Sequence, residues 1–167
     1  MNWKNTVVLI TGGTGSFGRE FVRIMLKRYR PKKLIVFSRD EFKQHQMQSE
    51  LDHPSLRYFI GDVRDFSRLR RAFGGVDVVV HAAALKQIPS CEYNPFEAVM
   101  TNIYGARNVI DAAIDCGVTK VMALSTDKAV NPASVMGASK RLGEMVCQAL
   151  QQPAGTRFVM VRFGNVL

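Results

Sequence analysis

Short runs of apolar residues recur along the chain, and longer stretches with helical spacing separate them. The runs are rich in Val, Ile and Phe, and several contain almost no polar residue. This pattern is typical of strands that are buried on both faces of a parallel sheet. We therefore predict six strands, at Val7–Ile10, Leu34–Phe37, Leu56–Ile60, Val76–Val80, Val121–Leu124 and Arg157–Val161.

The stretches between these runs have the spacing of amphipathic helices. In the first of them, Phe21, Ile24 and Met25 fall on one helical face. The predicted helices are Phe17–Tyr29, Glu41–Leu51, Ser67–Phe73 (capped by Asp65), Pro95–Cys116 and Ser139–Gln152. Strands that alternate with helices predict an α/β fold with a doubly wound parallel sheet. Because ligands bind such sheets at the carboxyl ends of the strands, the residues that follow each strand are the candidates for a site.

The composition is that of one globular domain, with 167 residues, 47% of them hydrophobic and 22% charged. No apolar run is long enough to span a bilayer, and Val7–Ile10 is too short for the core of a signal peptide. The three cysteines are scattered, and no His or Cys pair has metal-ligand spacing. We therefore predict a cytoplasmic location, no membrane segment and no metal site.

The net charge of +9 is uneven, because residues 1–71 alone carry +8. A basic half is compatible with an anionic partner such as nucleic acid. However, many of these charges fall on one predicted helix and its exit, and no basic stripe is interleaved with aromatic residues. We interpret the charge as a solvated helix face and expect no nucleic-acid binding.

A glycine-rich segment follows the first predicted strand. Gly12, Gly15 and Gly18 have the spacing G-x-x-G-x-x-G and lead into a helix. Glycine allows the backbone to turn tightly and to approach a pyrophosphate, which the helix N-terminus then attracts. In a strand–turn–helix context this pattern predicts a dinucleotide site, with contacts from Gly12, Thr14, Gly15, Ser16, Phe17 and Gly18. The alternative is a purely structural glycine turn.

The second strand ends in residues that suit the adenosine ribose. An acidic residue at the strand end selects NAD, whereas Ser38 and Arg39 suit the 2′-phosphate of NADP, with Lys43 as a helper. We therefore favour NADP over NAD, although Asp40 is a competing signal and a surface Arg–Asp pair is the alternative.

Further cofactor contacts follow the third and fourth strands. Asp62 and Val63 are candidates for the adenine, and the alternative of a helix cap fits Asp65 better. Small residues after the fourth strand allow the backbone to approach the nicotinamide half. The candidates there are Ala82, Ala83, Ala84 and Lys86, together with Asn102 as a buried polar bridge in the long helix. His81 is interpreted as a packed histidine and not as a catalytic one.

The fifth strand leads into a cluster of chemically active side chains. Ser125, Thr126, Asp127 and Lys128 arrive at one strand end. An adjacent carboxylate and ammonium can shift each other's pKa and act as acid and base. A plain surface ion pair is the alternative.

Together these segments resemble the extended short-chain dehydrogenase/reductase superfamily. Within it they are most similar to UDP-N-acetylglucosamine 4,6-dehydratases, which act in capsule, O-antigen and flagellin-sugar pathways. The motif STDKA, followed by NP and GASK, is far more specific than the glycines. The resemblance rests on Ile10–Gly18, Phe37–Asp40, Tyr58–Asp65, His81–Pro89, Thr101–Ile103, Leu124–Pro132, Met136–Arg141 and Arg162–Val166.

The resemblance implies a mechanism and roles. NADP would take a hydride from C4 of the sugar, water would leave across C5 and C6, and the hydride would return to C6. Asp127 would be the acid at the C6 hydroxyl and Lys128 the base at C5. Ser125 or Thr126 would hold O4. Lys140 would be a catalytic residue that anchors the nicotinamide ribose of the cofactor and sets the local potential. The resemblance also implies substrate contacts by Lys86, Met136 and Asn165, a UDP-N-acetylglucosamine substrate and a homo-oligomer.

Two departures from the family pattern qualify these expectations. The superfamily usually has Tyr four residues before the active-site Lys, but this chain has Met136, which cannot exchange a proton; a branch of the dehydratases resembles it in this. Asp127, Lys128 or an ordered water are then the candidates to take the C4 proton. The family also continues into a smaller substrate domain, so we expect residues 1–167 to form the Rossmann domain and to be weakly active or inactive alone. A non-catalytic NADP-binding module and a nucleotide-sugar epimerase or reductase are the alternatives.

Overall fold

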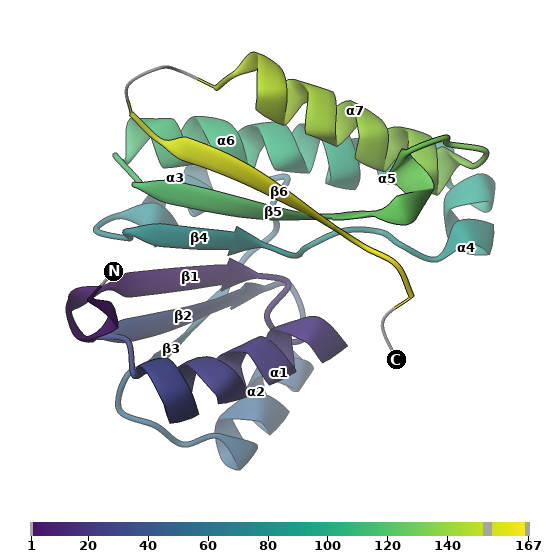
Figure 1. Cartoon of the computed structure of the whole chain (residues 1–167). Helices are drawn as coiled ribbons and strands as arrows, with labels where there is room; N and C mark the ends of the chain where they lie inside the picture. The colour runs from purple at the N-terminus through teal and green to yellow at the C-terminus, as the bar shows by residue number, and fades with distance from the viewer. Residues whose placement is uncertain (1, 152–154, 166–167) are drawn as a thin grey trace.

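The computed structural model describes residues 2–151 and 155–165, and six parallel strands form its central sheet in the order β3-β2-β1-β4-β5-β6 (Figure 1). This confirms the predicted doubly wound α/β fold. The strand order reverses between β1 and β4, which therefore form the switch point of the sheet. The strands are β1 (Val7–Thr11), β2 (Lys33–Ser38), β3 (Leu56–Ile60), β4 (Val78–His81), β5 (Lys120–Thr126) and β6 (Arg157–Phe163).

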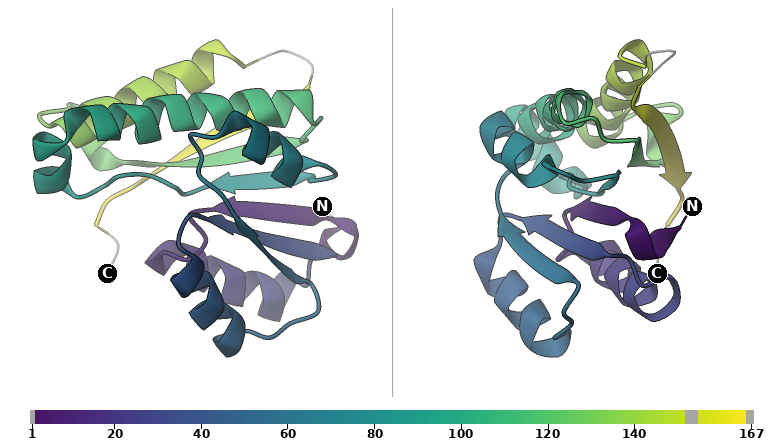
Figure 2. Two further views of the ribbon diagram at one scale, coloured as in Figure 1. Left: turned by 180° about the vertical axis from the view of Figure 1, so that it is seen from behind. Right: turned by 90° about the vertical axis from the view of Figure 1, so that its left-hand side faces the viewer.

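Helices lie on both faces of the sheet (Figure 2). On one face, α1 and α2 pack on β1 and β2 through Val22 and Met47, and on the other, α3, α6 and α7 complete a second apolar core. The helices are α1 (Ser16–Ile24), α2 (Glu41–Glu50), α3 (Phe66–Phe73), α4 (Ile88–Tyr93), α5 (Pro95–Val99), α6 (Gly105–Asp115) and α7 (Val135–Ala149). Single turns of other helix types are η1 (Trp3–Asn5), η2 (Met25–Tyr29), η3 (Met100–Tyr104) and η4 (Asp127–Ala129).

Several predicted boundaries were wrong. Strand β4 begins at Val78, two residues later than predicted, and includes His81. Strand β5 extends through Ser125 and Thr126, because these residues continue the ladder with β6 although they are polar. The predicted helix Pro95–Cys116 is divided into α5, a π-helical turn and α6.

Two helical segments differ more. Helix α7 begins four residues before the predicted start, because the Ser134 side chain caps it by accepting a hydrogen bond from the Gly137 amide at 3.1 Å. Helix α4 was not predicted at all. The predicted end of the last helix at Gln152 and the last residue of the Arg162–Val166 motif lie outside the described residues.

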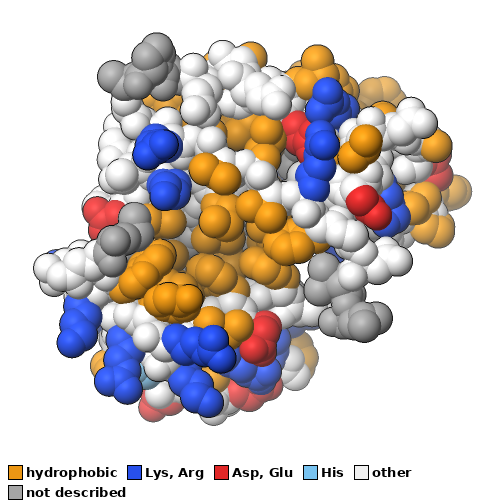
Figure 3. Space-filling model, in the orientation of Figure 1, with side chains coloured by type: hydrophobic (Ala, Val, Ile, Leu, Met, Phe, Trp, Pro, Cys, Tyr) orange, Lys and Arg blue, Asp and Glu red, His pale blue; other side chains and the backbone are white. Residues whose placement is uncertain are grey.

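One face of β5 and β6 is not covered by any helix in the described part of the chain (Figure 1). Along β6, Phe158 and Met160 point into the core that α6 and α7 cover, so the alternate residues face the other way. Val159 on that side is 40% exposed. Figure 3 shows hydrophobic side chains gathered across the middle of this face. The sheet is thus covered on both faces at β1 and β2 but open on one face at β5 and β6.

Candidate functional site

A cleft of about 880 Å³ lies at the carboxyl ends of the strands. It is lined by the glycine-rich loop after β1 and by the segments that follow β2, β3, β4, β5 and β6. Its size is in the range of ligand sites in proteins. The cleft therefore lies where a doubly wound sheet binds a dinucleotide.

The glycine-rich loop forms one wall of the cleft. Gly12 has a positive φ of 67° and packs directly against the Ala82–Ala83 backbone, so no side chain fits there. A β-carbon on Gly18 would collide with the Gly13 carbonyl oxygen, so this glycine allows α1 to start close to β1. Gly12 and Gly18 are therefore required by the backbone of this loop, as the motif predicted.

The N-terminus of α1 has no side-chain cap, unlike several other helices of the chain. Helices α2, α3 and α7 begin after Asp40, Asp65 and Ser134, whose side chains each accept a backbone N–H of the first turn. Helix α1 begins after Gly15, which has no side chain to do so. The N–H groups and positive dipole end of α1 are thus left for an anion. The loop fits the pyrophosphate of a dinucleotide.

The side chains at the end of β2 are already bonded within the protein, which the sequence did not predict. The Ser38 hydroxyl points inward, where it accepts hydrogen bonds from Thr14 at 3.1 Å and Gln44 at 3.4 Å. Asp40 caps α2, and the Lys43 backbone N–H lowers the pKa of its carboxyl. Arg39 forms a surface ion pair at 3.4 Å, with Asp62 and not with its neighbour Asp40. Arg39 and Lys43 are the cationic groups of the cleft at this strand end.

The predicted adenine contacts lie together at the end of β3. Arg64 holds the Asp62 carboxylate by its side chain at 2.8 and 3.0 Å. Burial raises the pKa of Asp62, but the hydrogen bonds from Arg64 outweigh this and the pKa lies below its usual value. Val63 is buried beside the cleft. Asp65 accepts the Arg68 amide at 3.0 Å, so it is the helix cap that the sequence predicted.

Small residues and Lys86 line the cleft after β4, as predicted. His81 lies inside the strand, where its Nδ1 atom is 2.8 Å from the Thr11 hydroxyl. Burial lowers the pKa of His81 to about 3, so the ring is neutral at physiological pH. The interpretation of His81 as a packed residue is confirmed.

Asn102 is a polar bridge but not a wall of the cleft. Its side chain is buried, accepts the Leu85 amide at 2.9 Å and donates to the Leu85 carbonyl oxygen and the Ser139 hydroxyl, both at 2.9 Å. Both amide hydrogens are therefore used within the protein. Asn102 is thus the buried polar bridge that the sequence predicted, and it fixes the loop after β4 against α7; its contact with a cofactor stays a prediction.

The end of β5 brings the predicted acid–base pair together. Lys128 Nζ donates to Asp127 Oδ1 at 3.1 Å and to Asn165 Oδ1 at 3.4 Å. The Thr126 hydroxyl donates to Asp127 at 3.0 Å. Hydrogen bonds from Lys128 and, to a smaller extent, from Thr126 lower the pKa of Asp127. The Asp127 side chain is therefore a carboxylate at neutral pH. Thr126, Lys128 and Asn165 line the cleft.

Lys140 and Met136 lie on α7, close to the Asp127–Lys128 pair. Lys140 Nζ donates to the Leu124 carbonyl oxygen at 2.6 Å, and burial lowers the pKa of the amine to about 8. Met136 is only 4% exposed, packs with Cys91 and Ala98, and forms part of the cleft wall. Met136 and Lys140 are one turn apart on α7, with Met136 packed in the wall and Lys140 bonded to β5.

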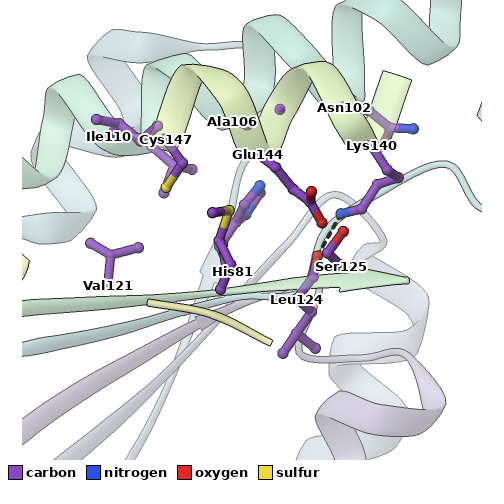
Figure 4. Close-up of a pocket in the computed structure, with 14 residues that line it drawn as sticks. His81, Asn102, Ala106, Ile110, Val121, Leu124, Ser125, Lys140, Glu144 and Cys147 are labelled. Carbon is purple, nitrogen blue, oxygen red and sulfur yellow. Dashed lines mark hydrogen bonds between the residues drawn. The ribbon is translucent and has the colours of Figure 1, made fainter. Parts of the chain in front are cut away.

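Sequence reasoning missed a buried ion pair next to Lys140. Glu144 on α7 accepts from Arg162 on β6 at 2.6 and 2.8 Å and from Arg141 at 3.0 Å (Figure 4 shows Glu144). Both arginines belong to the motifs Met136–Arg141 and Arg162–Val166, but neither motif shows that these side chains meet one carboxylate. The only signal in the sequence was that Glu144 follows Lys140 by four residues and so shares its helix face.

The described residues form neither a metal-binding cluster nor a membrane-spanning helix. Within residues 2–151 and 155–165, no three His, Cys, Asp or Glu side chains come together as they would around a metal ion. The helices in the same ranges include none with the length and apolar character needed to cross a bilayer.

Comparison with known protein families matches residues 8–167 to the family described as "Polysaccharide biosynthesis protein". The chain belongs to this family. The family assignment expected from the sequence motifs is therefore confirmed. The segments that match include the glycine-rich loop, the end of β5 and α7.

Proteins similar to this chain are named for different activities. A Campylobacter jejuni protein named UDP-N-acetylglucosamine 4,6-dehydratase (inverting) is 52% identical over 99% of this chain and 50% of its own length. A Rickettsia conorii protein named UDP-glucose 4-epimerase is 48% identical over 96% of this chain and 49% of its own length. This chain thus spans about half the length of these relatives.

Solved structures of similar proteins have the same fold. Pen from Bacillus thuringiensis is 42% identical, with a TM-score of 0.96 over 100% of this chain and 52% of that one. DesIV from Streptomyces venezuelae, a dTDP-glucose 4,6-dehydratase with NAD and TYD bound, is 28% identical, with a TM-score of 0.86 over 94% of this chain and 55% of that one. That relative binds a nicotinamide dinucleotide.

Proposed function

We propose that this chain is the cofactor-binding part of a UDP-N-acetylglucosamine 4,6-dehydratase that uses NADP. The observation that carries the proposal is the contact of Asp127 and Lys128 at the end of β5, beside Lys140 and at the edge of the cleft. Elimination of water needs a base for one proton and an acid for the departing hydroxyl, and a carboxylate beside an ammonium can supply both. The name of the C. jejuni relative supports this reaction class.

The cofactor would lie along the glycine-rich loop. The uncapped N-terminus of α1 would bind the pyrophosphate, and the Ala82–Ala84 segment would approach the nicotinamide half. Arg39 and Lys43 would bind a 2′-phosphate, which favours NADP over NAD. When bound, NADP would accept and return the hydride.

The side chains of the cleft would divide the proton chemistry between them. A proton passed from the Lys128 ammonium to the Asp127 carboxylate would leave Lys128 as an amine, the base at C5, and Asp127 as a carboxylic acid, the acid at the C6 hydroxyl. Because Lys128 and Thr126 hold Asp127 as a carboxylate, the acid role requires substrate to separate this ion pair and so raise the pKa of Asp127. Met136 has no exchangeable proton, so the C4 proton would pass to Asp127, Lys128 or an ordered water.

Substrate contacts would come from the same edge of the sheet. Lys86, Met136 and Asn165 line the cleft and would contact the nucleotide sugar. Ser125 or Thr126 would hold O4.

We also propose that residues 1–167 form one cofactor domain. The protein would work in the cytoplasm as a homo-oligomer, where its cysteines stay reduced. The three cysteines are free thiols in the structure.

A 4-epimerase is the second candidate, because the R. conorii relative has that name. The two reactions differ in mass. Incubation of the protein with NADP and UDP-N-acetylglucosamine, followed by mass spectrometry, should show only a small amount of product that has lost one water, because we expect residues 1–167 alone to be weakly active at most. An epimer of unchanged mass would overturn the dehydratase proposal in favour of the epimerase.

Calorimetric titration of the same protein with NADP and with NAD separates cofactor binding from turnover. Tighter binding of NADP supports the cofactor proposal. Binding without turnover would show a binding module without catalysis in residues 1–167. No binding of either dinucleotide would overturn the proposed site altogether.

A further inference from the structure

Glu144 is a buried carboxylate that the proposed chemistry does not use. Its side chain is 3% exposed, and the Nε and Nη2 atoms of Arg162 grip both of its oxygens, at 2.8 and 2.6 Å. Arg141 adds a third bond at 3.0 Å. Hydrogen bonds from Arg162 above all lower the pKa of Glu144 to about 2. The group is therefore charged at every physiological pH.

Stability alone does not explain a charge at this place. Removing a carboxylate from water costs several kcal/mol, and a well-packed apolar residue is often as stable as a buried ion pair. The surroundings are largely apolar, since Val109, Ile110 and Cys147 line the same small cavity. The position of Glu144 relative to the cleft offers another explanation.

On one side, Glu144 faces the Lys140 amine. The two residues are one helical turn apart on α7, and Figure 4 shows the Glu144 carboxylate pointing toward the Lys140 amine and the Ser125 hydroxyl. The Ser125 hydroxyl is buried and has no hydrogen-bond partner of regular geometry. These side chains surround a cavity of about 20 Å³, which is enough for one water.

On the other side, Glu144 holds the end of β6. Arg162 pairs in register with Ser125 of β5, and three residues later Asn165 accepts a hydrogen bond from Lys128. The Arg162 fork therefore fixes the strand that carries Asn165 against α7. The Glu144 carboxylate thus points toward Lys140 and is linked through Arg162 and Asn165 to Lys128, two of the lysines that line the cleft.

We propose that Glu144 is a positioning residue that sets two lysines of the cleft at once, Lys140 through α7 and Lys128 through Arg162 and Asn165. The inference does not depend on the dehydratase proposal, because it concerns the arrangement of the protein's own side chains. It can be measured without cofactor, substrate or turnover.

The test is nuclear magnetic resonance of lysines labelled at Cε, titrated with pH in the wild type and in Glu144→Gln. Around the Lys140 amine, the titratable and charged groups are His81 from β4, Glu144 and, through it, Arg162 from β6. His81 stays neutral from pH 6 upward. Glu144→Gln should lower the midpoint of Lys140 by roughly one unit, because a neighbouring negative charge is lost. It should also shift the Lys128 resonance. A folded variant with both lysines unchanged would overturn the proposal.

Two arginine variants test the two arms separately. Arg162→Lys keeps a cation beside Glu144 but loses the fork, so the Lys128 resonance should shift while the Lys140 midpoint stays. Arg141→Gln is the matched control, because Arg141 bonds the same carboxylate from within α7 and should leave Lys128 unchanged. If Glu144→Gln does not fold, an unshifted Lys128 in Arg162→Lys overturns the proposal by itself.

Discussion

A β-carbon on Gly12 would lie 2.8 Å from the amide nitrogen of Ala83. The two residues belong to the loops after β1 and β4, which meet at the switch point of the sheet. Gly12→Ala would add this collision with backbone to the strain of a side chain at a φ of 67°. We expect a loss of about 2–4 kcal/mol in the free energy of unfolding and a lower Tm.

Thermal unfolding measures this effect, and Gly74→Ala is the control. A β-carbon on Gly74 would meet only the Arg71 carbonyl oxygen, at an ordinary 3.7 Å, and Gly74 has a negative φ of −55°. Equal melting temperatures for the two variants would contradict the close approach of the two loops.

Arg39→Ala should weaken NADP binding and spare NAD. A charge-assisted hydrogen bond to a phosphate is worth about 1.5–3 kcal/mol, so the Kd for NADP should rise by roughly tenfold to a hundredfold. Titration calorimetry with both dinucleotides gives the comparison. Arg70→Ala removes a similar exposed arginine that pairs with Asp115 away from the cleft, and it should change neither affinity. An equal loss for NAD would assign Arg39 to another part of the cofactor.

Lys128→Ala should abolish turnover and leave the NADP affinity nearly unchanged. The reason is that Lys128 contacts Asp127 and Asn165 at the substrate edge of the cleft. The same variant should raise the pKa of Asp127 toward its ordinary value, because Lys128 is the main cause of its depression. Carboxyl resonances of labelled aspartate report that pKa. Collapse of NADP binding would instead make Lys128 a cofactor contact.

Stability should fall in acid through Glu144. Its pKa is about 2 in the folded protein and near 4.5 when unfolded, so the unfolded chain takes up the proton first. The stabilisation is complete above about pH 5 and is lost as the pH falls toward 2, by at most about 3 kcal/mol. Urea unfolding across this range should therefore show a flatter pH dependence in Glu144→Gln. Glu97→Gln, which removes an exposed partner of Arg64, should keep the wild-type slope.

The sequence predicted most of the fold because the chain separates strands and helices cleanly. Wholly apolar runs such as Leu34–Phe37 must be buried, which favours central strands. Gly12 and Gly18 stand between a strand and a helix, where a tight turn is the main reason for glycine. The predicted strand ends were wrong where polar residues continue the hydrogen bonding between strands, as Ser125 and Thr126 of β5 do with β6. Helix α4 is only six residues long, too short for apolar periodicity to be detected.

The sequence predicted where the cleft lies and which residues reach it, but it did not predict which of their side chains are bonded within the protein. Strand ends identify which residues reach the cleft, yet they do not show which side chains are already occupied. Ser38 and Asn102 are both buried and bonded within the protein, which depends on neighbours from other elements. Glu144 escaped notice because a glutamate on a helix ordinarily faces water, and its partner Arg162 lies 18 residues further along the chain.

The uncovered apolar face of β5 and β6 makes the colloidal behaviour of this chain depend on salt. The net charge of +9 repels one copy from another, while the open face favours contact between them. At low ionic strength the repulsion extends over tens of ångströms, but at 1 M salt it is screened within about 3 Å. Sulfate also strengthens the burial of apolar surface. Concentrated stocks should therefore stay dispersed in dilute buffer and cloud in ammonium sulfate.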